Sequence, residues 1–512
     1  MVRSHRVLVA SCLALATVVS AVASLNVALP EVARDTGASQ TELAWIVDAY
    51  ALVFAALLLP AGALGDRFGR RTALVTGLLV FSGAAGVAML VDSPGWLIAC
   101  RCGLGLGAAL VMPATLSTIT STFEAEARVR GIAIWSGIAG ASAILGLLLS
   151  GAVLELWSWP AVFGLSLVLA LVSLACVVAT VPESSDRQSA SNDPVGAILS
   201  VAGLAAVVYG IIEAPQRGWS STEVVLCLIG GLAVLEVFIW WELRIDNVRP
   251  LLDPRLFAKP TFAMGSLSLA VQFFCFFGFI FAFLQYLQFV RGDSPWMAAV
   301  SMLPLPLGLM PASRVSPKLL PRLGQAALCG AGLTLLAGSL ASLAVIETDT
   351  PYWTIGVAMW VMGLGMGLAM PPATTAITES LPPAEQGVAS AVNDLARELG
   401  GALGIATLGT VLNSEYRSSL VIAAAPAEVV DRVRESIAAA AVLGPDGLRA
   451  AGMAFTEGVN AALLVAAIVA VAGAIIVTCT LIPAGRPHTN NSHGAAPASA
   501  GQALARARQE GS

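Results

Sequence analysis

Two apolar segments joined by a short charged loop decide the fold of this chain. Residues 43–64 read LAWIVDAYALVFAALLLPAGAL, residues 65–71 read GDRFGRR, and residues 73–92 read ALVTGLLVFSGAAGVAMLVD. A helix needs about 20 apolar residues to cross a bilayer, and each outer segment has that length. The loop between them carries one acid and three arginines. This stretch predicts a hairpin of two membrane-spanning helices with its polar turn at the membrane edge.

The composition extends this expectation to the whole chain. Of the 512 residues, 57% are hydrophobic and 12% are charged, and the mean hydropathy is +0.83. Water-soluble domains carry about 25% charged residues, so a soluble fold is excluded. An all-α polytopic membrane protein is expected, either a transporter or a channel that is surrounded by lipid.

Charge and motifs exclude several classes of function. The net charge of −5 leaves no basic surface for nucleic acid. Neither Lys259 nor Lys318 follows a glycine, as a phosphate-binding G-x-x-x-x-G-K loop requires, so the chain is not expected to be an ATPase or another enzyme. The eight cysteines lie in apolar segments without metal-ligand spacing, so no metal or cofactor is expected. The three histidines lie in the polar tails, so a carboxylate must carry any transported proton.

Fourteen apolar segments follow one another along the chain. The first, which starts at Val7 after Arg3 and Arg6, also resembles a cleaved signal peptide, but its apolar run continues through Leu29 and favours a first span. The other thirteen lie near 43–64, 73–92, 95–118, 130–151, 160–181, 194–213, 222–242, 262–287, 296–312, 326–346, 353–372, 388–412 and 456–482.

The positive charges predict the orientation of these spans. With both termini in the cytoplasm, 18 of the 27 basic residues lie on the cytoplasmic side and seven on the outer side, as the positive-inside rule requires. Residues 413–455 then form a long outer loop with an amphipathic stretch at 427–441. Residues 483–512 are poor in large apolar side chains and are expected to be a disordered cytoplasmic tail.

An internal repeat divides the chain into two halves. The glycines and proline of Gly103-Leu-Gly105-Leu-Gly107 and Pro113-Ala-Thr recur as Gly363-Leu-Gly365-Met-Gly367 and Pro372-Ala-Thr. Chance similarity between two glycine-rich helices is the alternative. We expect a six-helix bundle at 1–181, two linker spans at 182–261 and a second six-helix bundle at 262–482. Transporters built from two such halves bind substrate between them.

The loop at 62–71 resembles the signature of the major facilitator superfamily. Its pattern G-x-L-x-D-R-x-G-R-R is matched at every specified position, by residues Gly62, Leu64, Asp66, Arg67, Gly69, Arg70 and Arg71. The resemblance implies that Asp66 and Arg70 form a latch of the cytoplasmic gate. The alternative is that the arginines only fix the topology by their charge.

The span count and further motifs narrow the resemblance to drug:proton antiporters with fourteen spans, among them the quaternary-ammonium exporters. The matching residues are Ala28-Leu29-Pro30-Glu31, WIVDAY at 45–50, Arg101 with Gly105, Gly107 and Pro113, LDPRLF at 252–257 and NDLARELGG at 393–401. This resemblance implies export of hydrophobic, cationic compounds in exchange for protons, driven by the proton gradient without a cofactor. It implies a monomer in the plasma membrane.

Charged residues inside spans are costly and therefore mark candidate functional sites. Asp48 begins the second span and is expected to meet a cation or a proton, although it could also cap the helix at the interface. For Arg101, in the glycine-rich fourth span, the resemblance implies a role with protons or substrate, and the alternative is a structural pair with a carboxylate.

The thirteenth span has the densest set of such charges. Asp394, Arg397 and Glu398 are spaced three and four residues apart, so they lie close together with Asn393 on one part of the helix. One acid is expected to form a structural pair with Arg397. The other, removed from water, would bind a proton more readily and exchange it for a cation.

Two departures from the family pattern bear on coupling. The acid of the first span is replaced by Ala21, and the antiporter motif of the fifth span reads Gly146-Leu147-Leu-Leu-Ser150-Gly151, without its proline. Proton coupling must therefore depend on Asp48, Asp394 or Glu398. Export of a self-made antibiotic or a lipid, or a sensor that no longer transports, are the alternative functions.

Overall fold

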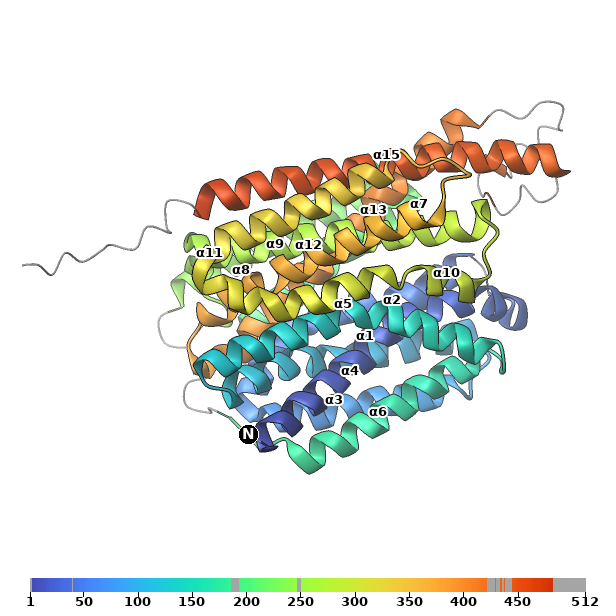
Figure 1. The fold of residues 1–512 in the computed structure, drawn as a ribbon. Coiled ribbons are helices and arrows are strands. Elements are labelled where there is room, and N and C mark those ends of the chain that lie inside the picture. The colour runs from blue at the N-terminus through green and yellow to red at the C-terminus, as the bar shows by residue number, and fades with distance from the viewer. Residues whose placement is uncertain are drawn as a thin grey trace, which may run out of the picture.

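The chain folds into one bundle of long helices in a computed structural model (Figure 1). The structure describes residues 2–38, 40–185, 193–245, 250–420, 429, 433–434, 437 and 444–481. Within these residues it contains helices and no strands. The helices are α1 (Val2–Thr36), α2 (Gln40–Phe68), α3 (Arg70–Ala88), α4 (Pro94–Thr122), α5 (Ala125–Leu154), α6 (Pro160–Thr180), α7 (Pro194–Arg217), α8 (Thr222–Arg244), α9 (Pro260–Gln285), α10 (Pro295–Ser301), α11 (Pro304–Leu343), α12 (Tyr352–Glu379), α13 (Gln386–Ser419) and α15 (Gly444–Leu481).

Three short turns of other helix types complete these elements. Two are 3₁₀ turns, at Pro254–Ala258 and Pro383–Glu385, and one is a π-helical turn at Tyr286–Val290 that continues α9. Proline occupies the first turn of α4, α6, α7 and α9, where its missing N–H costs no hydrogen bond.

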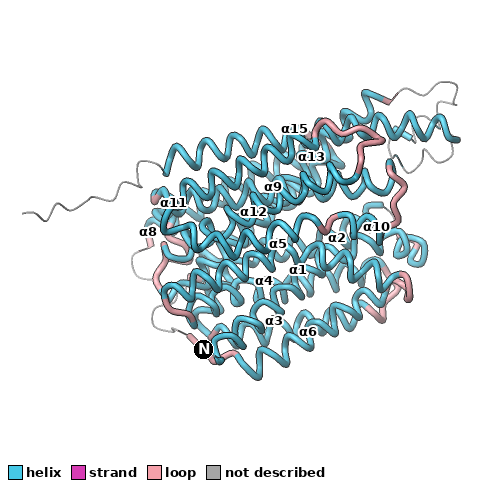
Figure 2. The backbone as a smooth tube through the Cα atoms, in the orientation of Figure 1, coloured by secondary structure: helices cyan, strands magenta, loops and turns pink. Residues whose placement is uncertain are grey.

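The structure agrees with the expected fourteen crossings. Thirteen described helical units are long and apolar enough to span a membrane, and one of them, Trp296–Leu343, has 48 residues. At 1.5 Å per residue that unit is more than twice as long as the ~30 Å thickness of a bilayer core. It breaks at Gly324, whose φ of 77° lies outside the helical region. The chain folds back there, as Figure 2 shows, so α11 has two antiparallel arms.

Helices extend into both ends of the range that the sequence predicted as an outer loop. α13 continues to Ser419 and α15 already begins at Gly444, so both ends of the range 413–455 are helical. Small and charged residues in these ends lowered the apolar signal without breaking the helices. Most of the stretch 427–441 and all of the tail 483–512 lie outside the described residues.

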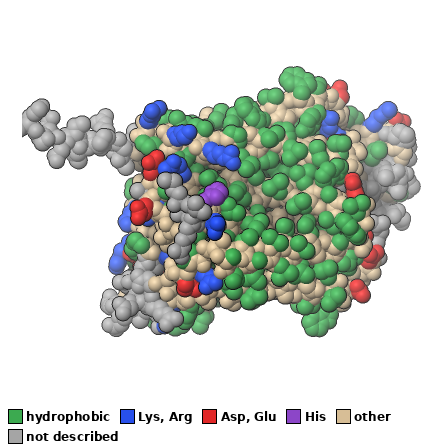
Figure 3. Space-filling model, turned by 60° about the horizontal axis from the view of Figure 1, so that its bottom comes forward, with side chains coloured by type: hydrophobic (Ala, Val, Ile, Leu, Met, Phe, Trp, Pro, Cys, Tyr) green, Lys and Arg blue, Asp and Glu red, His purple; other side chains and the backbone are tan. Residues whose placement is uncertain are grey.

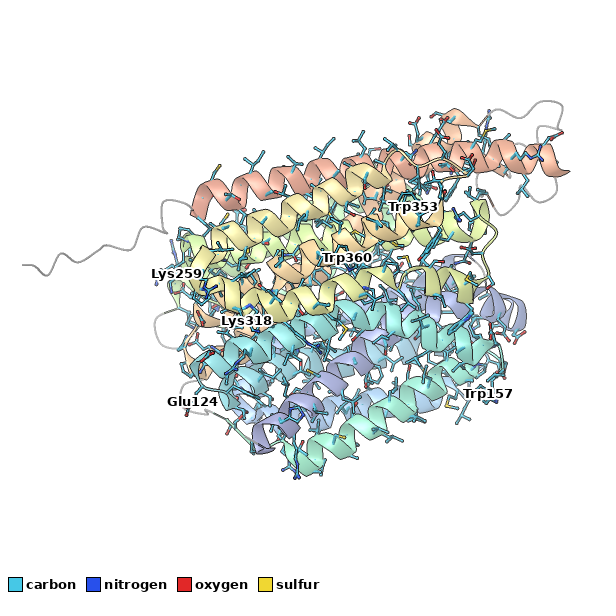
Figure 4. All side chains as sticks on the ribbon, in the orientation of Figure 1. Glu124, Trp157, Lys259, Lys318, Trp353 and Trp360 are labelled. Atoms are coloured by element: carbon cyan, nitrogen blue, oxygen red, sulfur yellow. The ribbon has the colours of Figure 1, made fainter. Side chains whose placement is uncertain are left out.

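The surface has an apolar band between two polar ends (Figure 3). One end, here called the Arg70 end, contains the turn between α2 and α3, and Glu124, Lys259 and Lys318 lie there in Figure 4. The opposite end, here called the Trp219 end, contains the turn between α7 and α8. Trp157 and Trp353 lie toward it and are 61% and 69% exposed. Exposed tryptophans near the edge of an apolar band are typical of a membrane interface.

The two glycine triplets pack in the same way. In α4, a Cβ at Gly105 would lie 2.6 Å from the carbonyl oxygen of Tyr50 on α2, and one at Gly107 would lie 2.7 Å from that of Gly77 on α3. In α12, Gly363 meets the first arm of α11 and Gly365 meets Gly332 on its second arm. Each triplet thus lets one helix pack closely against the two preceding helical segments. These are α2 and α3 for α4, and the two arms of α11 for α12. Small residues permit this contact where lipid leaves little hydrophobic driving force between helices.

The hairpin of α7 and α8 lies beside α2 and α13. The ring of Tyr209 on α7 lies 5.7 Å from the ring of Trp45 on α2. In the turn that follows α7, the indole N–H of Trp219 donates a hydrogen bond of 3.2 Å to Thr410 on α13. The hairpin therefore contacts both α1–α6, the first helix group, and α9–α15, the second helix group.

Candidate functional site

The charged loop between α2 and α3 is built around one ion pair. Arg70 donates hydrogen bonds of 3.1 and 2.7 Å to Oδ1 of Asp66, and both side chains are buried. Gly69 between the helices has a φ of 119°, a conformation that glycine adopts without strain. The expected pair of Asp66 and Arg70 is therefore present.

The same pair reaches the second helix group at the beginning of α13. Oδ2 of Asp66 accepts hydrogen bonds from the backbone N–H groups of Gly387 at 2.6 Å and Val388 at 3.3 Å. Arg70 also donates a hydrogen bond of 2.9 Å to the carbonyl oxygen of Pro383. The first N–H groups of a helix have no partner within it and carry partial positive charge, so they favour a carboxylate. We call these five residues the latch.

Two glycines permit this approach. A Cβ at Gly62 of α2 would collide with the backbone carbonyl of Gly387, and a Cβ at Gly387 would collide with that of Gly62. Any larger residue at either position would push α2 and α13 apart. The latch residues and these glycines therefore hold α2 and α13 in close contact at the Arg70 end.

A carboxylate outside the motif supports the loop. Glu183, which follows α6, accepts hydrogen bonds from the backbone N–H of Arg71 at 3.2 Å and of Thr72 at 3.1 Å, and from the Thr72 hydroxyl at 2.6 Å. It thereby caps the beginning of α3. Arg71 itself donates to the carbonyl oxygen of Val178. Arg67 lies with its guanidinium 5.4 Å from the ring of Phe68.

The two candidate acids of α13, Asp394 and Glu398, have different partners. Oδ1 of Asp394 accepts a hydrogen bond of 3.2 Å from Arg397 and one of 3.3 Å from the amide of Asn393. Asp394 and Arg397 are both buried. The structural pair expected in this helix is thus Asp394 with Arg397.

Two aromatic rings from other helices surround the guanidinium of Arg397. It lies 4.5 Å from the ring centroid of Phe273 on α9 and 5.4 Å from that of Trp135 on α5. The indole N–H of Trp135 is held by Thr115 of α4 at 3.0 Å. Trp135 belongs to the first helix group and Phe273 to the second, so Arg397 lies at their interface.

Glu398 differs from its neighbour. Its side chain is partly exposed, and it has no hydrogen bond or ion pair within the described part of the chain. It interacts electrostatically with Arg397 and Asp394, and with Tyr50 on α2. Glu398 is therefore the carboxylate of α13 that has no fixed hydrogen-bond partner among the described residues.

Arg101 and Asp48 form a second charged cluster, between α4 and α2. Arg101 donates hydrogen bonds to the carbonyl oxygens of Ile46 at 2.8 Å and Val47 at 3.3 Å, and its guanidinium lies 4.6 Å from the ring centroid of Tyr50. No ion pair of Arg101 with a carboxylate is found among the described residues, although it interacts electrostatically with Asp48. Asp48 is partly exposed.

The altered motif of α5 still packs closely on α1. A Cβ at Gly146 would collide with the carbonyl of Ser20, and Ser150 donates a hydrogen bond of 2.6 Å to the carbonyl oxygen of Ser24. Loss of the proline therefore leaves the contact between these two helices intact.

Sequence reasoning missed three residues of these clusters. Glu213 on α7 is buried, interacts electrostatically with Asp48 and pairs with Arg217. The position of Glu213 inside an apolar span could have identified it from the sequence, since acidic residues are rare inside such spans. Trp135 and Glu183 gave no such signal. Within the described residues, no group of three or more His, Cys, Asp or Glu side chains is placed to hold a metal ion.

Comparisons with known proteins agree with this architecture. Residues 11–405 match the model of the Major Facilitator Superfamily. The multidrug efflux pump LfrA of Mycolicibacterium smegmatis is 33% identical over 88% of this chain and 91% of its own. The puromycin resistance protein pur8 of Streptomyces alboniger is 34% identical over 76% and 77%. The methyl viologen resistance protein SmvA of Salmonella typhimurium is 32% identical over 77% and 80%.

Solved structures support the same fold. The human organic anion transporter MFSD10 has a TM-score of 0.60 at 13% identity, covering 93% of this chain and 99% of its own. A bacterial homologue of the lysosomal transporter Spinster has a TM-score of 0.58 at 20% identity, covering 93% and 97%. At this level of identity the likeness concerns the fold alone. The family match over most of the chain and the relatives at 30% identity or more establish that this chain belongs to the major facilitator superfamily, a family of transporters rather than enzymes.

Proposed function

We propose that this protein exports lipophilic organic cations across the plasma membrane in exchange for protons. Glu398 is the principal carboxylate of exchange, and Asp48 is a second. Asp394, Arg397 and Arg101 form the charged surroundings of these two acids.

The observation that carries this proposal is the unequal state of the two acids in α13. Asp394 is held by Arg397 and Asn393, whereas Glu398 is partly exposed and unpaired among the described residues. A carboxylate partly removed from bulk water and without a fixed ion pair favours either a proton or a mobile cation. Exchange requires one group that binds either a proton or a cation, but not both at the same time.

The surroundings favour an organic cation with apolar surface. Trp135 and Phe273 offer aromatic faces near Arg397, the residue before Glu398 in α13, and aromatic faces attract cations. Relatives named for multidrug efflux and for resistance to methyl viologen, an organic cation, support this substrate class.

Export would proceed by alternating access between the two helix groups. With both termini in the cytoplasm, the Arg70 end faces inward, and the latch closes the inner side. Opening it separates α2 from α13 and admits a cation from the cytoplasm. Proton binding to Glu398 from the outside then releases that cation outward. We propose that residues 1–181 and 262–482 are the two moving bundles, that 182–261 links them, and that a monomer is sufficient.

Reconstitution into liposomes tests this function, with ethidium as the probe cation. The wild type is expected to take up ethidium by counterflow without a gradient and to accelerate when a pH gradient is imposed. Glu398→Gln should keep counterflow but lose the acceleration, because its amide binds no exchangeable proton. Asp48→Asn should weaken the acceleration, and Asp394→Asn is measured beside them as the neighbouring acid.

Each negative result has its own meaning. If the wild type shows no counterflow, the chain does not transport this cation. If it shows counterflow but ignores the gradient, proton exchange is wrong. If Glu398→Gln and Asp48→Asn both retain gradient-driven uptake, the site is wrong.

A further inference from the structure

Arg397 is held less firmly than the other buried arginines of the charged clusters. Arg70 makes three side-chain hydrogen bonds, of 2.7 to 3.1 Å, and Arg101 makes two. Arg397 makes one within the described residues, at 3.2 Å, and its Nε has no partner although it is buried. Hydrogen bonds between a guanidinium and a carboxylate are usually about 2.7–2.9 Å long. Its five N–H donors are therefore largely unused.

The acceptors around it are also unsatisfied. Oδ2 of Asp394 and Oδ1 of Asn393 have no hydrogen-bond partner in the part of the chain that the structure describes, and the exposed fractions of these residues are 1% and 0%. Buried acceptors without a donor are uncommon in folded proteins and are costly. Asp394, the carboxylate that pairs with Arg397, therefore keeps one unused acceptor, and its neighbour Asn393 keeps another.

The remaining walls are aromatic. The guanidinium of Arg397 lies near the ring faces of Phe273 at 4.5 Å and Trp135 at 5.4 Å. Aromatic faces combined with a carboxylate form a general recognition site for organic cations. The site lies at the interface of the two helix groups, which is where a transporter of this kind exposes its cargo.

We propose that Arg397 is a tethered cation that occupies the substrate site, and that an exported cation binds by displacing its guanidinium from Trp135, Phe273 and Asp394. This inference rests on the proposed function and names the site for its substrate. The ligand class is a monovalent organic cation that stacks on aromatic rings, preferably with N–H groups for Asp394 and Asn393. The displaced guanidinium remains near Glu398, the other carboxylate with which it interacts.

Binding measurements on the purified full-length protein test this competition. The probe is phenylguanidinium, which reproduces the displaced group, and the control ligand is phenylurea, its neutral analogue. Arg397→Ala is expected to bind phenylguanidinium at least about tenfold more tightly than the wild type, since one competing cation–aromatic and charged hydrogen-bond interaction is removed. Phenylurea affinity should not change, and Arg397→Lys should stay near the wild type.

Further variants show whether the gain arises at this site. Adding Trp135→Leu to Arg397→Ala should abolish the gain, and ethidium should displace phenylguanidinium from Arg397→Ala. Arg397→Gln removes the charge but keeps much of the volume, so it provides the comparison if the alanine variant does not fold. Arg130→Ala, at a side chain 63% exposed, is the surface control and should bind as the wild type does.

Three results would overturn the inference: equal or weaker binding by both neutral variants, a gain that survives Trp135→Leu, or failure of ethidium to compete. Failure of the proposed function is separate. It would appear as absent or uncoupled ethidium transport by the wild type, while the comparison of binding affinities still reports whether Arg397 competes.

Discussion

The carboxylate of Asp66, on α2, accepts a hydrogen bond of 2.6 Å from the backbone N–H of Gly387, at the beginning of α13. The two residues are 321 positions apart in the chain and belong to different helix groups. Because Asp66 also pairs with Arg70 of α3, one carboxylate joins three helices at the Arg70 end. This contact exists only while α2 and α13 touch, so it reports directly on closure of that end.

Neutralising Asp66 should open the Arg70 end. Asp66→Asn keeps one acceptor for Gly387 but loses the ion pair with Arg70. Hydrogen bonds to charged groups contribute about 1.5–3 kcal/mol, so the closed population should fall about tenfold or more. Spin labels at Glu124 and Lys259, in a background without native cysteines, should show a longer distance. Asp92→Asn, at an exposed position, should leave the distance distribution unchanged, and an unchanged distribution in Asp66→Asn would refute the latch.

A single methyl group at Gly62 should prevent closure. Its Cβ would collide with the carbonyl of Gly387, whereas a Cβ at Gly83 on α3 meets no atom within 4 Å. Gly62→Ala is therefore expected to reduce ethidium transport strongly at normal expression, and Gly83→Ala to transport normally. Equal transport by the two variants would mean that the close approach of α2 and α13 is not needed.

Arg101 should contribute to stability through its fork of hydrogen bonds. Arg101→Lys cannot reach both carbonyls on α2 with the same geometry and loses the planar contact with Tyr50. We expect a loss of about 2 kcal/mol, seen as a lower thermal unfolding midpoint in detergent. The matched exchange Arg130→Lys, at an exposed side chain, should not lower the midpoint. A midpoint for Arg101→Lys equal to that of the wild type would show that these two hydrogen bonds do not stabilise the fold.

The orientation of the chain can be tested independently of transport. Because most basic residues outside the spans are expected on the cytoplasmic side, a peptide tag placed after Ser512 should be recognised by its antibody only after cells are permeabilised. Recognition of the tag on intact cells would invert the topology and would place the latch at the outer side.

The spans were predictable because lipid imposes a simple requirement on them. The expected span at 160–181 and the observed α6 (Pro160–Thr180) agree closely, since proline marks its beginning and the run is uninterrupted. The helical ends of the range 413–455 were missed because they carry small and charged residues that lower hydropathy while remaining compatible with a helix.

The candidate site was predictable only within single helices. The spacing of Asp394, Arg397 and Glu398 indicated a polar cluster, but their division into a paired and an unpaired acid depends on side-chain directions. The neighbours from other helices, such as Trp135 near Arg397 and Gly387 near Asp66, depend on tertiary packing across more than 250 residues. No local pattern encodes that proximity.

The central claim is that binding of an organic cation removes a proton from Glu398, and proton release on cation binding tests it most directly. Purified protein is placed in weakly buffered solution near neutral pH, and saturating ethidium is added while a pH indicator is followed. The account predicts that the wild type and Asp92→Asn, at an exposed position, release protons and that Glu398→Gln releases markedly fewer. Release from Glu398→Gln equal to that from the wild type would contradict it.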